Sequence, residues 1–142
     1  MKLAEILDRY PDHKAAFLDK KLAGFGDGLV NLMYSLALTQ TKRQPVGAKV
    51  SNFVLAGALS AAGLRHFAPS RADRQRLADV VEAIVAYAWL RGVITLGATS
   101  RILMRDFTQR NLRDRKDLRE GAKEGFTHLL TRIAGRLKLG RG

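Results

Sequence analysis

The stretch from Leu77 to Leu90 reads Leu-Ala-Asp-Val-Val-Glu-Ala-Ile-Val-Ala-Tyr-Ala-Trp-Leu, which is apolar on nearly every side of a helix. A helix of this kind is buried in the interior of a protein. It nevertheless carries Asp79 and Glu82, which are three residues apart and therefore share one face. Because burying an unpartnered carboxylate is costly, the sequence predicts arginine partners or a divalent cation beside these two acids.

Apolar residues recur at helical spacing along most of the chain, and few stretches alternate as strands do. Helices are expected near residues 3–7, after Pro11, and over residues 28–39, 51–62, 71–91, 95–106 and 114–138. Three glycines at 24, 26 and 28 are expected to interrupt the chain before the third helix, and Ser70-Arg-Ala-Asp73 resembles a capping box that opens the fifth. The sequence predicts an all-α fold, a helical bundle.

Composition limits the chemistry that this chain of 142 residues can perform. It has no Cys, which excludes disulfides, thiol nucleophiles and cysteine-ligated zinc. Its three His are far apart in sequence and form no ligand motif. Any bound metal must therefore be held by carboxylates, which suit Mg²⁺ or Mn²⁺.

The net charge of +12 is unevenly distributed. Residues 1–100 hold 13 basic and 8 acidic residues, whereas residues 101–142 hold 12 basic and 5 acidic ones. We therefore expect a helical domain over residues 1–110 and a basic helical extension, residues 111–142, packed on the same domain. Such an excess of positive charge indicates a polyanionic partner, and nucleic acid is the foremost candidate. Without a signal-peptide core or an apolar stretch of about 20 residues, we expect a cytoplasmic protein with no membrane partner.

A third isolated acid, Asp27, lies between Gly26 and Gly28 at the expected start of the third helix. A carboxylate is favoured at a helix N-terminus, so a capping role is one interpretation. The other is a metal site, which requires this helix end to pack against the middle of the 71–91 helix. Three carboxylates would then converge, enough for a Mg²⁺ ion that also keeps bound water.

Three segments, in order, resemble those of the ribonuclease III family. Gly26-Asp27-Gly28-Leu-Val-Asn31 is similar to the heart of the family signature, in which a Gly-Asp pair opens an apolar helix. Lys49-Val-Ser51-Asn52-Phe-Val-Leu-Ala is similar to the middle helix, whose polar start approaches the RNA backbone. Leu77-Ala-Asp79-Val-Val-Glu82-Ala-Ile is very similar to the second motif, Leu-Ala-Asp-x-x-Glu-Ala-Leu/Ile.

The resemblance implies a homodimeric endoribonuclease that cuts double-stranded or structured RNA and leaves 5′-phosphate and 3′-hydroxyl ends. It implies that Asp27, Asp79 and Glu82 hold Mg²⁺ or Mn²⁺ and act as the catalytic residues. Positions that would contact RNA are Lys20, Lys21, Asn31, Lys49, Ser51, Asn52, Arg71 and Arg74. Each also has a plain interpretation as a helix cap, a surface residue, a solvated charge or a neutralising partner of the acids.

The chain departs from the family pattern at several positions. The two Glu of the usual signature fall at Lys20 and Ala23, and one of them is a metal ligand in standard members. The apolar residue that family members insert into the partner subunit falls at Gly24, with Phe25 as a substitute. No double-stranded-RNA-binding domain is recognisable after the helical region. The small Mini-ribonuclease III relatives also lack a carboxylate at the Ala23 position and still cleave RNA.

Two other functions compete with an endoribonuclease. A non-catalytic RNA-binding or ribosome-associated protein on a degenerate ribonuclease III fold is favoured by Lys20 and Ala23. A helix-turn-helix DNA-binding protein is a weaker hypothesis, since Gly63 allows a turn but the following helix is very apolar for a DNA groove.

Overall fold

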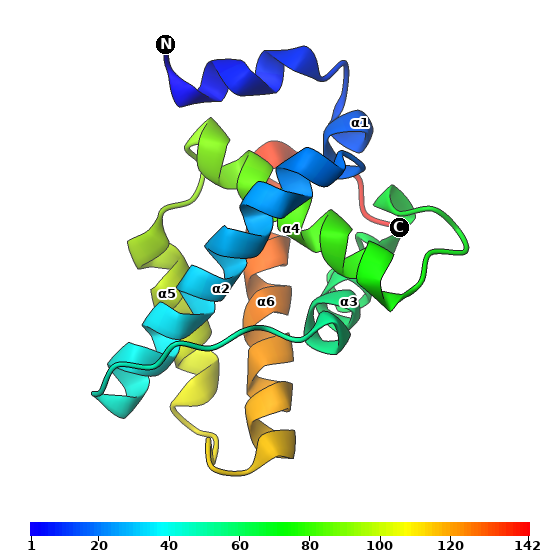
Figure 1. Cartoon of the computed structure of the whole chain (residues 1–142). Helices are drawn as coiled ribbons and strands as arrows, with labels where there is room; N and C mark the ends of the chain where they lie inside the picture. Colours follow the sequence, from blue (N-terminus) through cyan, green and yellow to red (C-terminus); the bar gives the residue numbers. More distant parts are fainter.

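The computed structural model describes all residues, 1–142, and is built from helices alone (Figure 1). In chain order these are η1 (Leu3–Arg9), α1 (His13–Phe17), α2 (Lys20–Lys42), α3 (Asn52–Ala61), η2 (Arg65–Phe67), α4 (Arg74–Arg91), α5 (Leu96–Phe107) and α6 (Arg115–Leu137). The two η elements are short 3₁₀ helices. The prediction of an all-α fold is confirmed. None of the helices combines the length and the apolar character needed to cross a membrane.

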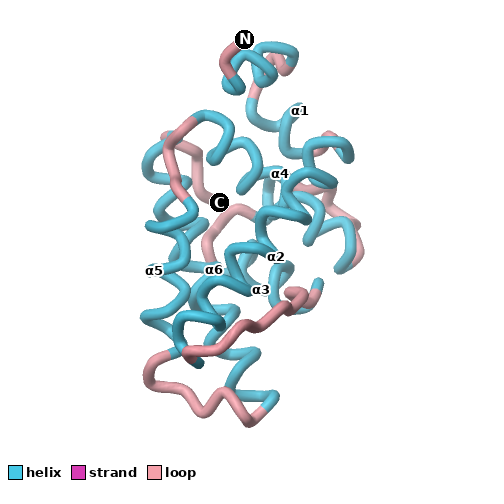
Figure 2. The backbone as a smooth tube through the Cα atoms, turned by 60° about the vertical axis from the view of Figure 1, so that its left-hand side comes forward, coloured by secondary structure: helices cyan, strands magenta, loops and turns pink.

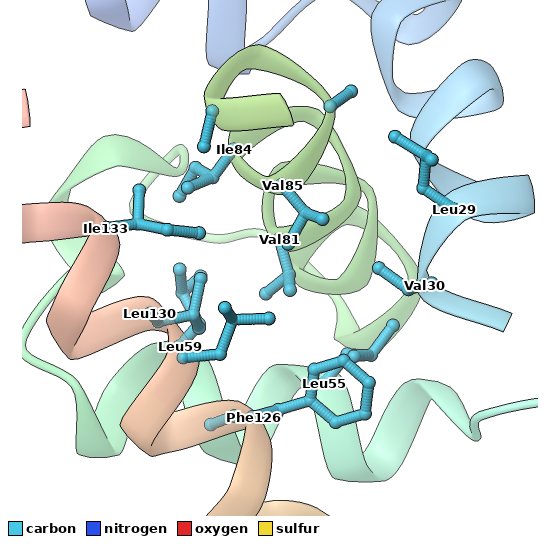
Figure 3. Close-up of a cluster of buried hydrophobic side chains, with 14 of the residues drawn as sticks. Leu29, Val30, Leu55, Leu59, Val81, Ile84, Val85, Phe126, Leu130 and Ile133 are labelled. Carbon is cyan, nitrogen blue, oxygen red and sulfur yellow. The ribbon is translucent and has the colours of Figure 1, made fainter. Parts of the chain in front are cut away.

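Helix α4 lies at the centre of the molecule, as its apolar sequence predicts. It packs against α2, α3, α6, α1 and η1. In the close-up of the core, Ile84 and Val81 of α4 point toward side chains of α3 and α6, and Val30 of α2 lies on the other side of the helix (Figure 3). The recognition helix of a helix-turn-helix protein must enter a DNA groove, and a helix buried on this many sides is not free to do so.

The C-terminal helix α6 belongs to the same core. Its residues Phe126, Leu129, Leu130 and Ile133 are fully buried, and the helix packs mainly against α5 and α3. Gly125 allows this approach, because a Cβ atom there would lie 2.8 Å from a methyl carbon of Leu103 on α5. Most of the basic residues after position 110 are thus carried by a helix that is part of the hydrophobic core.

The expected break at the three glycines is wrong. Helix α2 runs without interruption from Lys20 to Lys42, so Asp27 lies inside the helix and caps nothing. The cap is Asp19, whose side chain accepts a hydrogen bond from the backbone N–H of Lys21. Glycine weakens a helix by only about 1 kcal/mol per residue, and the packing of α2 on α4 outweighs that cost.

The expected capping box at Ser70 is also wrong by three residues. Helix α4 begins at Arg74, and its N-cap is Asp73, whose carboxylate accepts a hydrogen bond of 2.8 Å from the Arg76 N–H. The Ser70 carbonyl instead accepts a hydrogen bond from the Arg65 guanidinium. The arginines at 71 and 74 therefore lie before the helix and at its first residue.

The segment between α2 and α3 runs back from the end of α2 to the start of α3 (Figures 1 and 2). It is held by side chains one turn apart on α2. The Thr39 hydroxyl donates to the Val46 carbonyl and accepts from the Val46 N–H, and the Ser35 hydroxyl does the same with Ala48. These bonds fix the path of residues 46–50.

Gly26 sets the separation of α2 and α4. A Cβ atom at this position would lie 1.9 Å from the backbone oxygen of Glu82, a distance that no side chain tolerates. Only glycine therefore permits the two helices to cross this closely, and the crossing places the residue after Gly26 beside α4.

We expect Gly26→Ala to destabilise the protein by at least about 2 kcal/mol, because the added methyl group forces α2 away from the α4 backbone. Gly28→Ala is the matched control: nothing lies within 4 Å of its Cβ position, so helix propensity predicts stabilisation by about 0.5–1 kcal/mol. Urea unfolding of both variants measures the two effects. Equal stability of the two variants would contradict the close crossing.

Candidate active site

A cleft of about 430 Å³ opens between α2, α4 and the start of α3. It is lined by nine residues, most of them polar: Lys20, Ala23, Gly24, Asp27, Lys49, Asn52, Gln75, Asp79 and Glu82. The three predicted carboxylates are all among them. The structure thus brings one acid of α2 and two acids of α4 to a single cleft.

Glu82 is the most buried of the three acids, with only 7% of its surface exposed. Burial raises its pKa to about 8, and a hydrogen bond with Asp27 together with the negative charges of Asp27 and Asp79 acts in the same direction. In the metal-free protein at neutral pH, Glu82 therefore holds a proton and shares it with Asp27.

Asp79 has its pKa raised as well. The cause is again burial, which outweighs the opposite effect of the nearby Arg76 and Lys20. The Arg76 guanidinium donates to the Leu18 carbonyl rather than to the carboxylate. All ion pairs within 4 Å lie elsewhere, at Arg110 and His128. The ion pairs with arginine that the sequence allowed for Asp79 and Glu82 are therefore absent.

Asp27 is oriented by its own helix. The Asn31 amide, one turn further along α2, donates a hydrogen bond of 3.2 Å to Asp27 and accepts one of 2.8 Å from the Val50 N–H. Asn31 therefore links the carboxylate to the segment that carries Lys49. The positive charge of Lys49 lowers the pKa of Glu82, against the larger effect of burial, which places the lysine near this acid.

The donor set suits a hard divalent cation, since carboxylate oxygens are the ligands that Mg²⁺ prefers. No group of three or more Asp, Glu or His side chains is close enough to enclose a metal ion without other ligands. Mg²⁺ is commonly held by one or two carboxylates, several waters and the phosphates of its substrate. Asp27 and Glu82, in hydrogen-bonding contact, fit this mode of binding, and Asp79 lines the same cleft.

The positions expected to contact RNA are distributed over several places. Lys20, Lys49 and Asn52 line the cleft. Ser51 is the N-cap of α3 and accepts from the Val54 N–H. Lys21 lies in a separate, largely apolar groove formed with η1. Arg71 is exposed in the loop before α4, and Arg74 lies over the ring of Phe53.

Sequence reasoning missed Gln75, which lines the cleft one turn before Asp79 on α4. Its spacing of four residues from Asp79 was the available signal, because residues i and i+4 share a helix face. The close helix crossing at Gly26 was missed too. Gly26 packs against the backbone of α4, and a backbone contact does not depend on which residue stands at the contacted position.

The comparison with protein families agrees with this geometry. The family model described as Ribonuclease III matches residues 20–139 of the 142-residue chain, and this range includes the cleft and helix α6. The chain belongs to the ribonuclease III family. This membership supports a ribonuclease-like function. No curated protein matches the chain.

The raised pKa of Glu82 predicts a pH-dependent stability. The folded protein binds this proton more tightly than the unfolded chain, so the contribution of Glu82 to stability is fully present below pH 4.5 and is lost as the pH rises to about 8. We expect Glu82→Gln to unfold like the wild type near pH 4.5. At pH 8–9 in EDTA it should be more stable by a few kcal/mol. A stability difference that does not change with pH would contradict the buried carboxyl pair.

Proposed function

We propose that this protein is a metal-dependent endoribonuclease that hydrolyses phosphodiester bonds in double-stranded or structured RNA. The products would carry 5′-phosphate and 3′-hydroxyl ends. The observation that carries the proposal is the convergence of Asp27, Asp79 and Glu82 on one cleft that is also lined by Lys20 and Lys49. Acids and exposed lysines side by side suit a site that must hold both a cation and a phosphate.

Asp27 and Glu82 would hold Mg²⁺ or Mn²⁺, with Asp79 completing the negative charge of the site. A divalent cation supplies Lewis-acid stabilisation of phosphate charge and activates water for attack on phosphorus. Asn31 keeps the Asp27 carboxylate directed into the cleft. Because Glu82 is protonated in the metal-free protein, occupation of the site releases its proton.

The cations around the cleft would position the RNA. Lys20 and Lys49 are exposed and lie near enough to Asp79 and Glu82 to affect their pKa values, so they would contact RNA phosphate at the cleft. Asn52 would bind a phosphate oxygen at the start of α3. Ser51, Lys21, Arg71 and Arg74 are weaker candidates, because none of them lines the cleft. Asn31 is proposed as a positioning residue because its amide is already bonded on both sides.

The homodimer and the cytoplasmic location are also part of the proposal. Phe25 and Leu32 of α2 expose 47% and 45% of their surface, although residues of this size are usually covered. Phe25 also lines an apolar groove with Leu3 and Ile6 of η1. A second subunit on this face of α2 would bury all four side chains.

A non-catalytic RNA-binding protein on the same fold is the second candidate. Two observations favour it: the signature acids are replaced by Lys20 and Ala23, and no three acids enclose a metal ion. This candidate predicts RNA binding that is sensitive to salt and independent of divalent ions.

Incubation with labelled duplex RNA and Mg²⁺ or Mn²⁺ tests the proposal. We expect cleavage by the wild type and a loss of at least about a hundredfold in the Asp79→Ala, Glu82→Ala double variant, since removal of the charges abolishes the cation site. Glu120→Gln, which removes an exposed acid of α6 outside the cleft, should cleave normally. Metal-independent binding without cleavage in any of these metals would establish the second candidate instead.

A further inference from the structure

An exposed aromatic ring at the start of α3 is in contact with two arginines. Phe53 is the second residue of this helix and exposes 45% of its surface. The Arg74 guanidinium carbon of α4 is 5.0 Å from the ring centroid, and that of Arg119 on α6 is 5.3 Å away. Three helices that are distant in sequence thus place one ring and two guanidinium groups together.

The charge beside this ring is not neutralised by acids. Arg74 and Arg119 take part in none of the ion pairs of the protein. One turn after Arg119, the Lys123 side chain lies over Gly57, where its Cε atom is 3.0 Å from the position of a Cβ atom. We call Phe53, Arg74, Arg119 and Lys123 the aromatic shelf.

The aromatic shelf begins at the edge of the cleft. Phe53 follows Asn52, and Arg74 precedes Gln75; both Asn52 and Gln75 line the cleft. Neighbouring Cα atoms are only about 3.8 Å apart, so the shelf and the cleft adjoin on two helices at once. A nucleic-acid strand bound in the cleft could therefore extend directly onto the aromatic shelf.

The chemistry of the shelf fits a nucleotide. Aromatic rings and guanidinium planes stack on nucleobases, and unpaired cations bind phosphate. Bases inside an uninterrupted duplex are already stacked on each other and do not present a free face. The shelf therefore suits a base that is unpaired, in a bulge, a loop or a strand end.

We propose that the aromatic shelf binds an unpaired nucleotide next to the RNA segment held in the cleft. The inference rests on the proposed function and narrows its substrate class to structured RNA with an unpaired nucleotide beside the cleaved segment. The base stacks on the exposed part of the Phe53 ring, and Arg119 and Lys123 bind the adjoining phosphate.

The test uses two RNAs, a short duplex with a single bulged 2-aminopurine and the same duplex without the bulge. Stacking quenches 2-aminopurine fluorescence, and titration in EDTA measures binding without cleavage. We expect quenching by the wild type and tighter binding of the bulged RNA. Phe53→Leu, which keeps the apolar bulk, should abolish the quenching and weaken binding of the bulged RNA at least about fivefold. Its binding of the plain duplex should not change.

Arg119→Gln should reduce binding of the bulged RNA as well. Arg132→Gln is the matched control, because it removes an exposed arginine about 20 Å further along the same helix. Thermal unfolding of all variants detects a merely structural role, which would lower the melting temperature and weaken both RNAs equally. That result, or the same quenching in wild type and Phe53→Leu, would overturn the proposal.

Cleavage of both RNAs in Mg²⁺ separates this inference from the proposed function. Cleavage of both at equal rates by wild type and Phe53→Leu would overturn the shelf and leave the endoribonuclease standing. Quenching that depends on Phe53 without any cleavage would support the shelf and overturn the endoribonuclease.

Discussion

The structure depends on the contact between Gly26 of α2 and the backbone of α4 at Glu82. Without a side chain at residue 26, the two helices cross closely enough for Asp27 and Glu82 to share a hydrogen bond. The same crossing buries Glu82 and gives the cleft one wall from each helix. The packing of the core and the chemistry of the site thus have one origin.

The electrostatics of the cleft follow from burial without arginine partners. Glu82 is buried and Asp79 is partly buried, and both have raised pKa values because burial disfavours their charged forms and no ion pair compensates. Acids that serve stability alone are expected to have ion-pair partners, so the absence of such partners at Glu82 and Asp79 supports the proposed binding role. Lys20 and Lys49 line this cleft, whereas the usual signature has acids at Lys20 and Ala23. Under the proposed function, a cleft with fewer acids and more cations would hold one divalent ion rather than two, and a substrate phosphate would supply further ligands.

Much of the fold was predictable because it follows from local patterns. The apolar run at Leu77–Leu90 predicted the buried helix α4, and the acids within it, Asp79 and Glu82, line the cleft together with Asp27. The helix expected over residues 51–62 is α3, and Ser51 is its N-cap. The continuity of α2 was not predictable, since glycine propensity argues for a break and only the tertiary contact at Gly26 reverses it. Other features could not be predicted because they depend on which helices meet in the fold. They are the position of Gln75 in the cleft, the hydrogen bonds of Asn31 and the arginines beside Phe53.

The apparent pKa of Glu82, followed by the side-chain carboxyl ¹³C resonance in glutamate-labelled protein, tests the central claim most directly. The account predicts a value of about 8 in the absence of divalent cations, because Asp27 and the core surround this acid. Saturating Mg²⁺ should lower the value below neutrality, since the ion replaces the shared proton. A pKa near the ordinary 4.5 in the metal-free protein, or one that Mg²⁺ leaves unchanged, would contradict a cation site at this helix crossing.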